Sequence, residues 1–321
     1  MEYISCGNIM SDMVVESVDN SDPNEIMKNT RLSIGGPALY ALSGIRLWTK
    51  DCKLVSNTGA DYVDDYKPWM DRNGLSCESI HPLQEHVIVH ELSYDRADGG
   101  YNFASRYGAE HLGYLKTRPS DIDKAAEGGR VKGMYMAQDC DLVWWKQFAG
   151  VKAKHGFKMM WEIEYNPKSS KTPKLDKILE CMQYADMFSF NHNEASLIFG
   201  IPREDDEAII NEIMKFPVEL TLYRVGKRGS YAVTPDGAWF CPAIDPHGPS
   251  VDPTGCGNNS TGAAMYAHVS GHDPLMTAVM ANVASGYNAM QYGPYPEYTD
   301  AVMKEAAELA DSTYKKLAAD K

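Results

Sequence analysis

The sequence has no CxxC pair, no apolar run long enough to cross a bilayer and no excess of positive charge. Its seven cysteines are scattered and odd in number, which argues against a disulfide framework and against a zinc site. A membrane-spanning helix needs about 20 consecutive apolar residues, so we expect no membrane partner. No charged and apolar leader opens the chain, and we therefore expect a protein of the reducing cytoplasm.

Basic residues are in the minority, because 31 Lys and Arg face 44 Asp and Glu and give a formal net charge of -13. Such a charge argues against nucleic acid or another polyanion as the main partner. A small phosphorylated ligand is still allowed, since the backbone amides of a single loop can bind it locally. With 321 residues, 44% of them hydrophobic, the chain is long enough to bury a large core.

Strand-like and helix-like segments alternate along most of the chain. Apolar runs such as YISCGN, GMYMAQ and FKMMWEIEY are separated by segments with helical periodicity, among them residues 141–155, 172–184 and 205–215. This alternation predicts an α/β fold with a mainly parallel central sheet that is covered on both faces. No repeat or long linker interrupts the pattern, so residues 1–321 are predicted to form a single domain.

The alternation of strand-like and helix-like segments is interrupted at residues 86–106. There, HVIVHELSYDRADGGYNFASRY has the pattern of two alternating strands around a DGG turn. Together with residues 10–20, this hairpin is predicted to form a small antiparallel β lid that projects from the main sheet. The exposed edge strands of such a lobe can pair with those of a second subunit, so we expect a homodimer through the lid.

Four short motifs lie between the predicted elements. They are GG at 35–36, NHNE at 191–194, VGKRG at 225–229 and DPTGCG at 252–257. The last of them leads into a helix predicted over 258–271. Glycine lets the backbone approach an anion closely, and the unpaired amides of a first helical turn point at it. The amides of Gly255, Cys256 and Gly257 are therefore predicted to bind a phosphate group.

In this order, the four motifs and the lid-like hairpin resemble the ribokinase/PfkB family of sugar and nucleoside kinases over essentially the whole chain. The resemblance implies a ribokinase-like three-layer α/β sandwich with a small antiparallel β lid. It also implies ATP and Mg²⁺ as cofactors and a small sugar or nucleoside as the acceptor. In such a kinase, the loop amides stabilise the charge that develops on the transferred phosphoryl group.

The resemblance further implies two groups of binding residues. The residues implied for the acceptor are Asp12, Gly35, Gly36, Tyr40 and Asp252. The residues implied for the nucleotide are Asn191, Glu194, Gly226, Lys227, Gly229 and Asn282, with Glu194 holding Mg²⁺ through water. Tyr40 stands roughly where many family members carry an asparagine, so we expect a pocket of different size and polarity. A purely structural role stays open for Asp12 in a turn and for Glu194 at a helix N-terminus.

The end of the DPTGCG signature departs from the family pattern. Asn258 stands where the family has the aspartate that accepts the proton of the attacking hydroxyl. An amide cannot take that proton at neutral pH, and the loss of a general base costs roughly 10²–10⁴ in rate. The sequence therefore predicts ATP-dependent phosphorylation of a sugar or nucleoside hydroxyl that is weakened or altered by Asn258.

Three alternatives stay open at this point. In the first, the proton goes to another group, such as His247, Glu162 or water. In the second, the protein binds a sugar, nucleoside or nucleotide without turnover. In the third, the fold carries out a different reaction, such as hydrolysis of a sugar phosphate or nucleoside. An introduced Asp→Asn change at 258 is also compatible with the sequence, although Asn259 and the STG segment after it indicate wider divergence.

Overall fold

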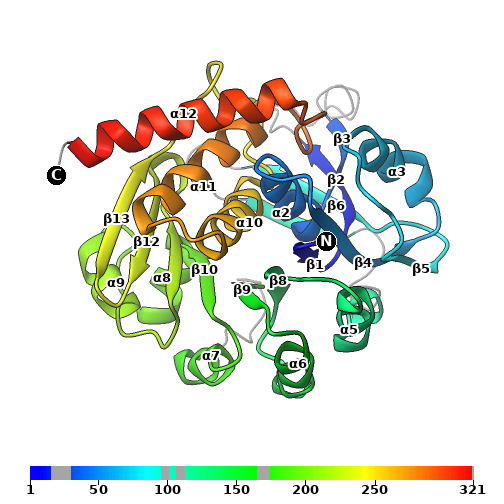
Figure 1. Cartoon of the computed structure of the whole chain (residues 1–321), viewed down its shortest axis with the longest axis horizontal. Coiled ribbons are helices and arrows are strands. Elements are labelled where there is room, and N and C mark those ends of the chain that lie inside the picture. Colours follow the sequence, from blue (N-terminus) through cyan, green and yellow to red (C-terminus); the bar gives the residue numbers. More distant parts are fainter. Residues whose placement is uncertain (16–29, 95–100, 106–112, 165–173, 320–321) are drawn as a thin grey trace.

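A computed structural model of the 321-residue chain describes residues 1–15, 30–94, 101–105, 113–164 and 174–319. Two β-sheets lie in this part of the chain (Figure 1). The larger sheet has nine strands in the order β13-β12-β11-β10-β9-β8-β1-β4-β5. Its strands are β1 (Tyr3–Cys6), β4 (Cys52–Gly59), β5 (Ile80–Gln84), β8 (Gly133–Gln138), β9 (Lys158–Ile163), β10 (Met187–Asn191), β11 (Leu220–Arg224), β12 (Gly229–Thr234) and β13 (Gly237–Pro242).

The larger sheet is parallel from β5 to β11, and β12 and β13 close one edge as an antiparallel hairpin. Strands of a parallel sheet are buried on both faces and are therefore apolar along their length. Strand β8, with the sequence GMYMAQ, is buried at all six positions, and β9 is buried at five of six. The carboxyl ends of β8 to β11 lie at the same edge, which is where open α/β sheets bind ligands.

Helices cover both faces of this sheet, and a hydrophobic core lies under each layer (Figure 1). The helices that contribute to one core are α2 (Pro37–Arg46), α3 (Tyr62–Arg72), α10 (Cys256–Val269), α11 (Pro274–Asn288) and α12 (Asp300–Ala319). Those that contribute to the other are α5 (Pro119–Ala126), α6 (Leu142–His155), α7 (Leu175–Met182), α8 (His192–Phe199) and α9 (Asp206–Ile213). The predicted three-layer α/β sandwich is thus confirmed.

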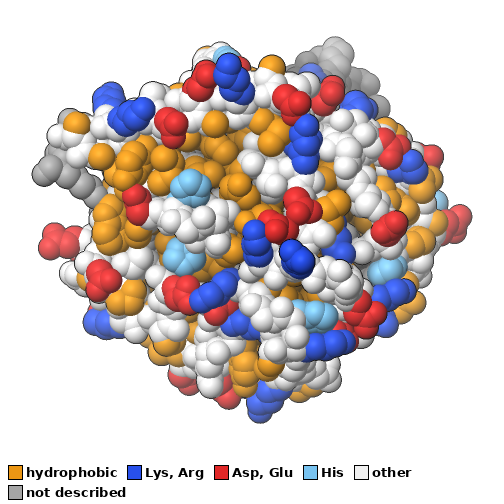
Figure 2. Space-filling view, in the orientation of Figure 1, with side chains coloured by type: hydrophobic (Ala, Val, Ile, Leu, Met, Phe, Trp, Pro, Cys, Tyr) orange, Lys and Arg blue, Asp and Glu red, His pale blue; other side chains and the backbone are white. Residues whose placement is uncertain are grey.

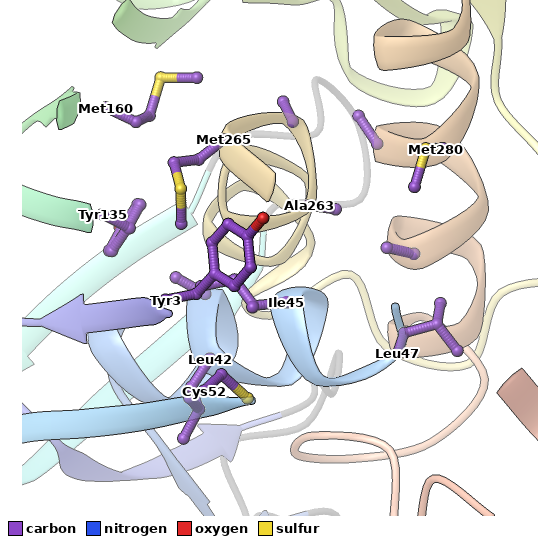
Figure 3. Close-up of a cluster of buried hydrophobic side chains, with 14 of the residues drawn as sticks. Tyr3, Leu42, Ile45, Leu47, Cys52, Tyr135, Met160, Ala263, Met265 and Met280 are labelled. Atoms are coloured by element: carbon purple, nitrogen blue, oxygen red, sulfur yellow. The ribbon is translucent and has the colours of Figure 1, made fainter. Parts of the chain in front are cut away.

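Helices α2 and α10 pack closely because small residues face each other between them. A Cβ atom on Gly262 would lie 2.2 Å from the Ala41 carbonyl oxygen, and one on Gly44 would lie 2.0 Å from the Asn259 carbonyl oxygen. Figure 3 shows the core beneath them, with Tyr135 and Met265 on neighbouring elements. This close packing fixes the position of the first turn of α10, which carries the predicted anion loop.

The smaller sheet contains four strands in the order β3-β2-β6-β7. Its strands are β2 (Met10–Val15), β3 (Thr30–Gly35), β6 (Val89–Tyr94) and β7 (Tyr101–Ser105). Strand β2 is antiparallel to β3 and parallel to β6, and β6 is antiparallel to β7. Sequence reasoning did not predict β3. The parts of the predicted lid at 16–20, 95–100 and 106 lie outside the described residues.

The face of the molecule in Figure 2 carries basic and acidic side chains interspersed with hydrophobic ones. Among the described residues, no helix combines the length and apolar character that crossing a bilayer requires.

Candidate active site

A cavity of about 1940 Å³ opens between the carboxyl ends of β8–β11, the start of α10 and the smaller sheet. It brings together most of the predicted site residues. Those on its wall are Asp12, Gly36, Tyr40, Asn191, Glu194, Gly226, Lys227, Gly229, Gly255, Cys256, Gly257, Asn258 and Asn282. The side chain of Asp252 and the backbone of Gly35 are buried next to this wall.

The predicted anion loop is a tight turn that ends at the first residue of α10. The Asp252 carboxylate accepts hydrogen bonds from the Thr254 backbone N–H at 3.0 Å and from the Thr254 hydroxyl at 2.7 Å. Gly255 follows with φ +76°, a left-handed conformation that favours glycine. Helix α10 begins at Cys256, two residues before the predicted start, so Asn258 is its third residue and not its first.

The prediction for the loop amides needs one correction. The Cys256 N–H donates to the Pro253 carbonyl at 3.1 Å, so this amide closes the turn and does not face an anion. In the first turn of a helix, N–H groups lack a partner within the helix. The amides of Gly257 and Asn258 are the second and third of α10 and are the ones that the geometry offers to a phosphate.

The Cys256 side chain packs beneath the loop. Its thiol donates to the Ser285 carbonyl at 3.5 Å, and the Asn288 side-chain amide lies 3.6 Å from the sulfur. Burial raises the pKa of this thiol to about 11, so it stays protonated at neutral pH. The side chain therefore has a packing role.

Asp12, Gly35 and Tyr40 form a second part of the site, at the base of the smaller sheet. Asp12 is 4% exposed, and its carboxyl group lies close to Tyr40 and Gly36. A Cβ atom on Gly35 would lie 1.9 Å from Asp12 Oδ2, so only glycine fits beside this carboxyl group. Burial raises the pKa of Asp12 to about 7, while the neighbouring Tyr40 and Gly36 act in the opposite direction.

We expect Asp12→Asn to stabilise the protein at high pH and to have little effect at low pH. Because the pKa of Asp12 is about 7 when folded and near 3.8 when unfolded, the folded state holds more protons between these values. Stability then falls as pH rises through this window, and an amide does not titrate there. The gain should reach about 2–4 kcal/mol above pH 7.

Urea unfolding at pH 4, 5.5 and 8 measures this gain. Asp65→Asn removes an exposed carboxylate from α3 and serves as the matched control. A gain that is equal at pH 4 and pH 8 would rule out the burial of an ionisable Asp12 as its cause.

The NHNE motif forms a complete capping box at the start of α8. The Asn191 side chain accepts from the backbone N–H groups of Asn193 and Glu194, and Glu194 Oε2 accepts from the Asn191 N–H at 2.7 Å. The structural role that the sequence left open for Glu194 is therefore present. Glu194 also lines the cavity, and burial raises its pKa to about 7 while Arg224 acts in the opposite direction.

A chain of hydrogen bonds runs from Asn258 into the floor of the cavity. The Asn258 side-chain amide donates to the Tyr135 hydroxyl at 3.2 Å, and that hydroxyl donates to Glu162 Oε2 at 2.8 Å. Arg224 Nη2 lies 2.7 Å from Glu162 Oε1 and 3.9 Å from Glu194 Oε2. The guanidinium group also lies against the anion loop, because a Cβ atom on Gly257 would be 2.0 Å from Arg224 Nη1.

Sequence reasoning missed Tyr135 as part of this chain. Residues two apart on a strand point to the same face, and β8 and β9 pair Tyr135 with Met160 and Ala137 with Glu162. Tyr135 and Glu162 therefore lie on the sheet face that α10 covers. A polar side chain inside the apolar run GMYMAQ was the available signal, but its use depends on the register of the two strands.

Three further candidates have other positions or partners. His247 was considered as a proton acceptor, but its imidazole lies 2.9 Å from Glu305 Oε1 and is not among the residues that line the cavity. The Asn282 side-chain amide donates to the Ser230 hydroxyl at 2.7 Å and to the Ala278 carbonyl at 2.8 Å, which holds β12 against α11. Lys227 is exposed at the cavity wall in η1 (Gly226–Arg228).

A comparison with protein-family models identifies the family of this chain. The family model described as pfkB family carbohydrate kinase matches residues 1–299. The chain belongs to this family. The comparison with curated proteins found no match in sequence.

Solved structures with similar folds agree with this assignment. A Burkholderia thailandensis nucleoside kinase in complex with ADP-inosine has a TM-score of 0.71 at 18% identity, with 98% of this chain and 96% of that chain covered. Arabidopsis thaliana ribokinase complexed with ribose and ATP has a TM-score of 0.68 at 16% identity, with 96% and 98% covered. A nucleoside kinase from Methanocaldococcus jannaschii has a TM-score of 0.67 at 18% identity, with 96% and 99% covered. At these identities the likeness establishes the ribokinase-like fold.

Proposed function

We propose that this pfkB-family protein transfers a phosphoryl group from ATP to a hydroxyl group of a sugar or nucleoside. The observation that carries the proposal is one continuous cavity, which joins the first turn of α10 to the Asp12 carboxyl group. The helix start suits a phosphate, and a short carboxylate suits two neighbouring hydroxyl groups. Two of the similar structures are complexes of this kind: one with ADP-inosine and one with ribose and ATP. These ligands are consistent with a nucleotide and an acceptor that share one cavity.

The anion-binding side of the cavity suits the phosphates of ATP. The N–H groups of Gly257 and Asn258 would meet the transferred phosphoryl group, and Arg224 lies beside them with its guanidinium against Gly257. Fixed donors of this kind stabilise the charge that develops during transfer. Gly226, Lys227, Gly229 and Asn282 would form the wall beside the rest of the nucleotide.

The same side could accommodate Mg²⁺ only as an ion held mainly by the phosphates. Among the described residues, no group of three or more His, Cys, Asp or Glu side chains could hold a metal ion by itself. Mg²⁺ keeps several waters and often uses one or two carboxylates together with substrate phosphates. Glu194 lines the cavity and would hold the ion through water, and the bound ion would neutralise phosphate charge.

A cytoplasmic location and a dimer through the smaller sheet also stay predictions.

The acceptor side of the cavity determines which hydroxyl is presented. Asp12 and the backbone of Gly36 would bind the acceptor, with Asp252 acting indirectly by holding the loop through Thr254. Because the pKa of Asp12 is about 7, its carboxylate is fully available only above neutral pH. The affinity for the acceptor is therefore expected to rise as pH increases through 7.

A second candidate function is ligand binding without turnover. It is favoured by one observation, the Asn258 amide that donates to Tyr135 where a proton acceptor is expected. This candidate predicts that a sugar, nucleoside or nucleotide raises the melting temperature while no product forms. Hydrolysis of a sugar phosphate or nucleoside would instead give turnover in the absence of ATP.

A panel of sugars and nucleosides distinguishes these functions. ADP release from ATP and the melting temperature are measured for each compound with and without Mg²⁺. The proposed kinase function predicts ADP release that requires one class of acceptor and Mg²⁺. A stabilising ligand without ADP release would favour the binding function, and no response of either kind would reject both.

A further inference from the structure

Glu162 is a buried carboxylate on the wall of the cavity, next to the anion loop. It lies near the carboxyl end of β9 and is 4% exposed. Its Oε1 atom lies 3.9 Å from the position that a Cβ atom on Gly257 would occupy. Gly257 supplies one of the two amides that the helix start offers to a phosphate. Glu162 thus lies close to the place where phosphoryl transfer would occur.

The partners of Glu162 hold it in one orientation. The Tyr135 hydroxyl donates to Oε2 at 2.8 Å, and the Arg224 guanidinium donates to Oε1 at 2.7 Å. A carboxylate has about four acceptor positions on its two oxygens, so these two bonds leave room for a substrate hydroxyl. A charge-assisted bond to arginine is short and directional, so it fixes the orientation of the carboxyl group.

Three other acidic side chains of the cavity wall have different positions or partners. Asp12 lies at the smaller sheet, close to Tyr40 and Gly36. Glu194 closes the capping box of α8. Asp139 is paired with Lys116 at 2.9 Å and has a half-exposed side chain. Glu162 instead connects to Asn258 through one group, the Tyr135 hydroxyl, which bonds to both side chains.

The side chain at position 258 fits this arrangement as a hydrogen-bond donor, which an amide can be and a carboxylate cannot. Tyr135 has one hydroxyl proton, which it donates to Glu162, so its oxygen must accept from residue 258. Burial and the Glu162 carboxylate raise the pKa of Tyr135 well above its usual range, which keeps that single proton in place. A carboxylate at 258 would face the lone pairs of the Tyr135 oxygen, with Glu162 as a second negative charge behind it.

We propose that Glu162 is the catalytic residue that accepts the proton of the attacking hydroxyl, with Tyr135, Arg224 and Asn258 as the residues that position it. This inference rests on the proposed kinase function. In the step, the acceptor oxygen forms a bond to the γ-phosphorus as the bond from that phosphorus to the ADP oxygen breaks. The hydroxyl O–H bond breaks, and its proton passes to Glu162 Oε1. ADP leaves with the electron pair of the broken bond.

Three variants test this assignment: Glu162→Gln, Asn258→Asp and the combination of both. Glu162→Gln should lower kcat by about 10²–10⁴-fold and remove the acidic limb of the pH–rate profile. Asn258→Asp alone should lower the rate, because two carboxylates then compete for one Tyr135 proton. In the double variant, the carboxylate at 258 can accept a hydrogen bond from the Tyr135 hydroxyl. The rate of the double variant should therefore exceed that of Glu162→Gln at least about tenfold.

Matched variants separate this role from a structural one. Glu162→Asp keeps the charge but shortens the side chain, so it should lose rate and keep the acidic limb. Glu308→Gln removes an exposed carboxylate from α12 and should leave the profile unchanged. Melting temperature and ADP affinity are measured for each variant. Glu162→Gln leaves the buried Arg224 without its carboxylate partner and should lower the melting temperature, but the ADP affinity should change little if the side chain acts in the chemical step.

The possible outcomes distinguish the inference from the function on which it rests. If the unmodified protein shows acceptor-dependent turnover and Glu162→Gln keeps its rate and acidic limb, the role of Glu162 is wrong and the kinase function stands. A large gain from Asn258→Asp alone would also overturn the inference, because the missing acceptor would then be at 258. If the unmodified protein turns over no acceptor, the kinase function and the role of Glu162 are both rejected.

Discussion

Replacement of Arg224 by methionine is expected to lower the free energy of unfolding by about 3–5 kcal/mol at pH 7. Arg224 is 12% exposed and lies 2.7 Å from Glu162 Oε1 and 3.9 Å from Glu194 Oε2. Methionine fills much of the same space but leaves both buried carboxylates without their cation. Removing one partner of a buried ion pair is costly because the remaining charge has lost its contact with water.

The pH dependence of this loss identifies its cause. At pH 5, the Glu194 carboxyl group, whose pKa burial raises to about 7, is protonated and neutral, so the loss should be smaller than at pH 7. Denaturant unfolding at both values measures it. Arg224→Lys should lose less, because it keeps a charge, and the exposed Arg72→Met should stay within about 0.5 kcal/mol of the unmodified protein. A loss below 1 kcal/mol at pH 7 would contradict the buried network.

Gly255→Ala is expected to have the second large effect, on both stability and nucleotide binding. The new Cβ atom would lie 2.2 Å from Cδ1 and Cγ of the Tyr40 ring. Tyr40 is 1% exposed, so the ring has little freedom to move. The φ of +76° adds a strain that alanine does not tolerate well. We expect a loss of about 3 kcal/mol or more, together with the loss of ADP binding.

Gly271→Ala is the matched control for this prediction. Gly271 follows the C-terminal end of α10 and has φ +87°, but nothing lies within 4 Å of the position of an added Cβ atom. Its loss should therefore be about 1–2 kcal/mol, from backbone strain alone, with ADP binding retained. Chemical unfolding and calorimetric titration with ADP measure both quantities. Equal losses in the two variants would show that the Tyr40 contact contributes nothing.

Much of the fold follows from local sequence patterns. The alternation of apolar runs with helical periodicity predicted the central sheet and its covering helices, and the four motifs placed the family. Strand β3 was missed because its alternation is short, with only Leu32 and Ile34 between polar residues, and it ends directly in the glycine turn at 35–36. The start of α10 was placed too late, because glycine at its second position is a poor helix former and disguises the helix.

The candidate site was harder to predict, because its parts meet only in three dimensions. DPTGCG and NHNE are local, and each forms its turn or capping box from its own residues. The contact of Asn258 with Tyr135 spans 123 positions of the sequence, and no local pattern contains it. His247 precedes the anion loop in the sequence, yet its ring contacts Tyr287 and pairs with Glu305. Proximity in sequence was misleading there.

The fate of the γ-phosphoryl group tests the central claim most directly. The unmodified protein is incubated with γ-labelled ATP, Mg²⁺ and each sugar or nucleoside, and the labelled products are separated and identified by mass. The kinase function predicts that the label moves to a hydroxyl of one class of acceptor, in equal amount to the ADP formed. Label that stays in ATP with every acceptor, or that appears only as inorganic phosphate, would contradict it.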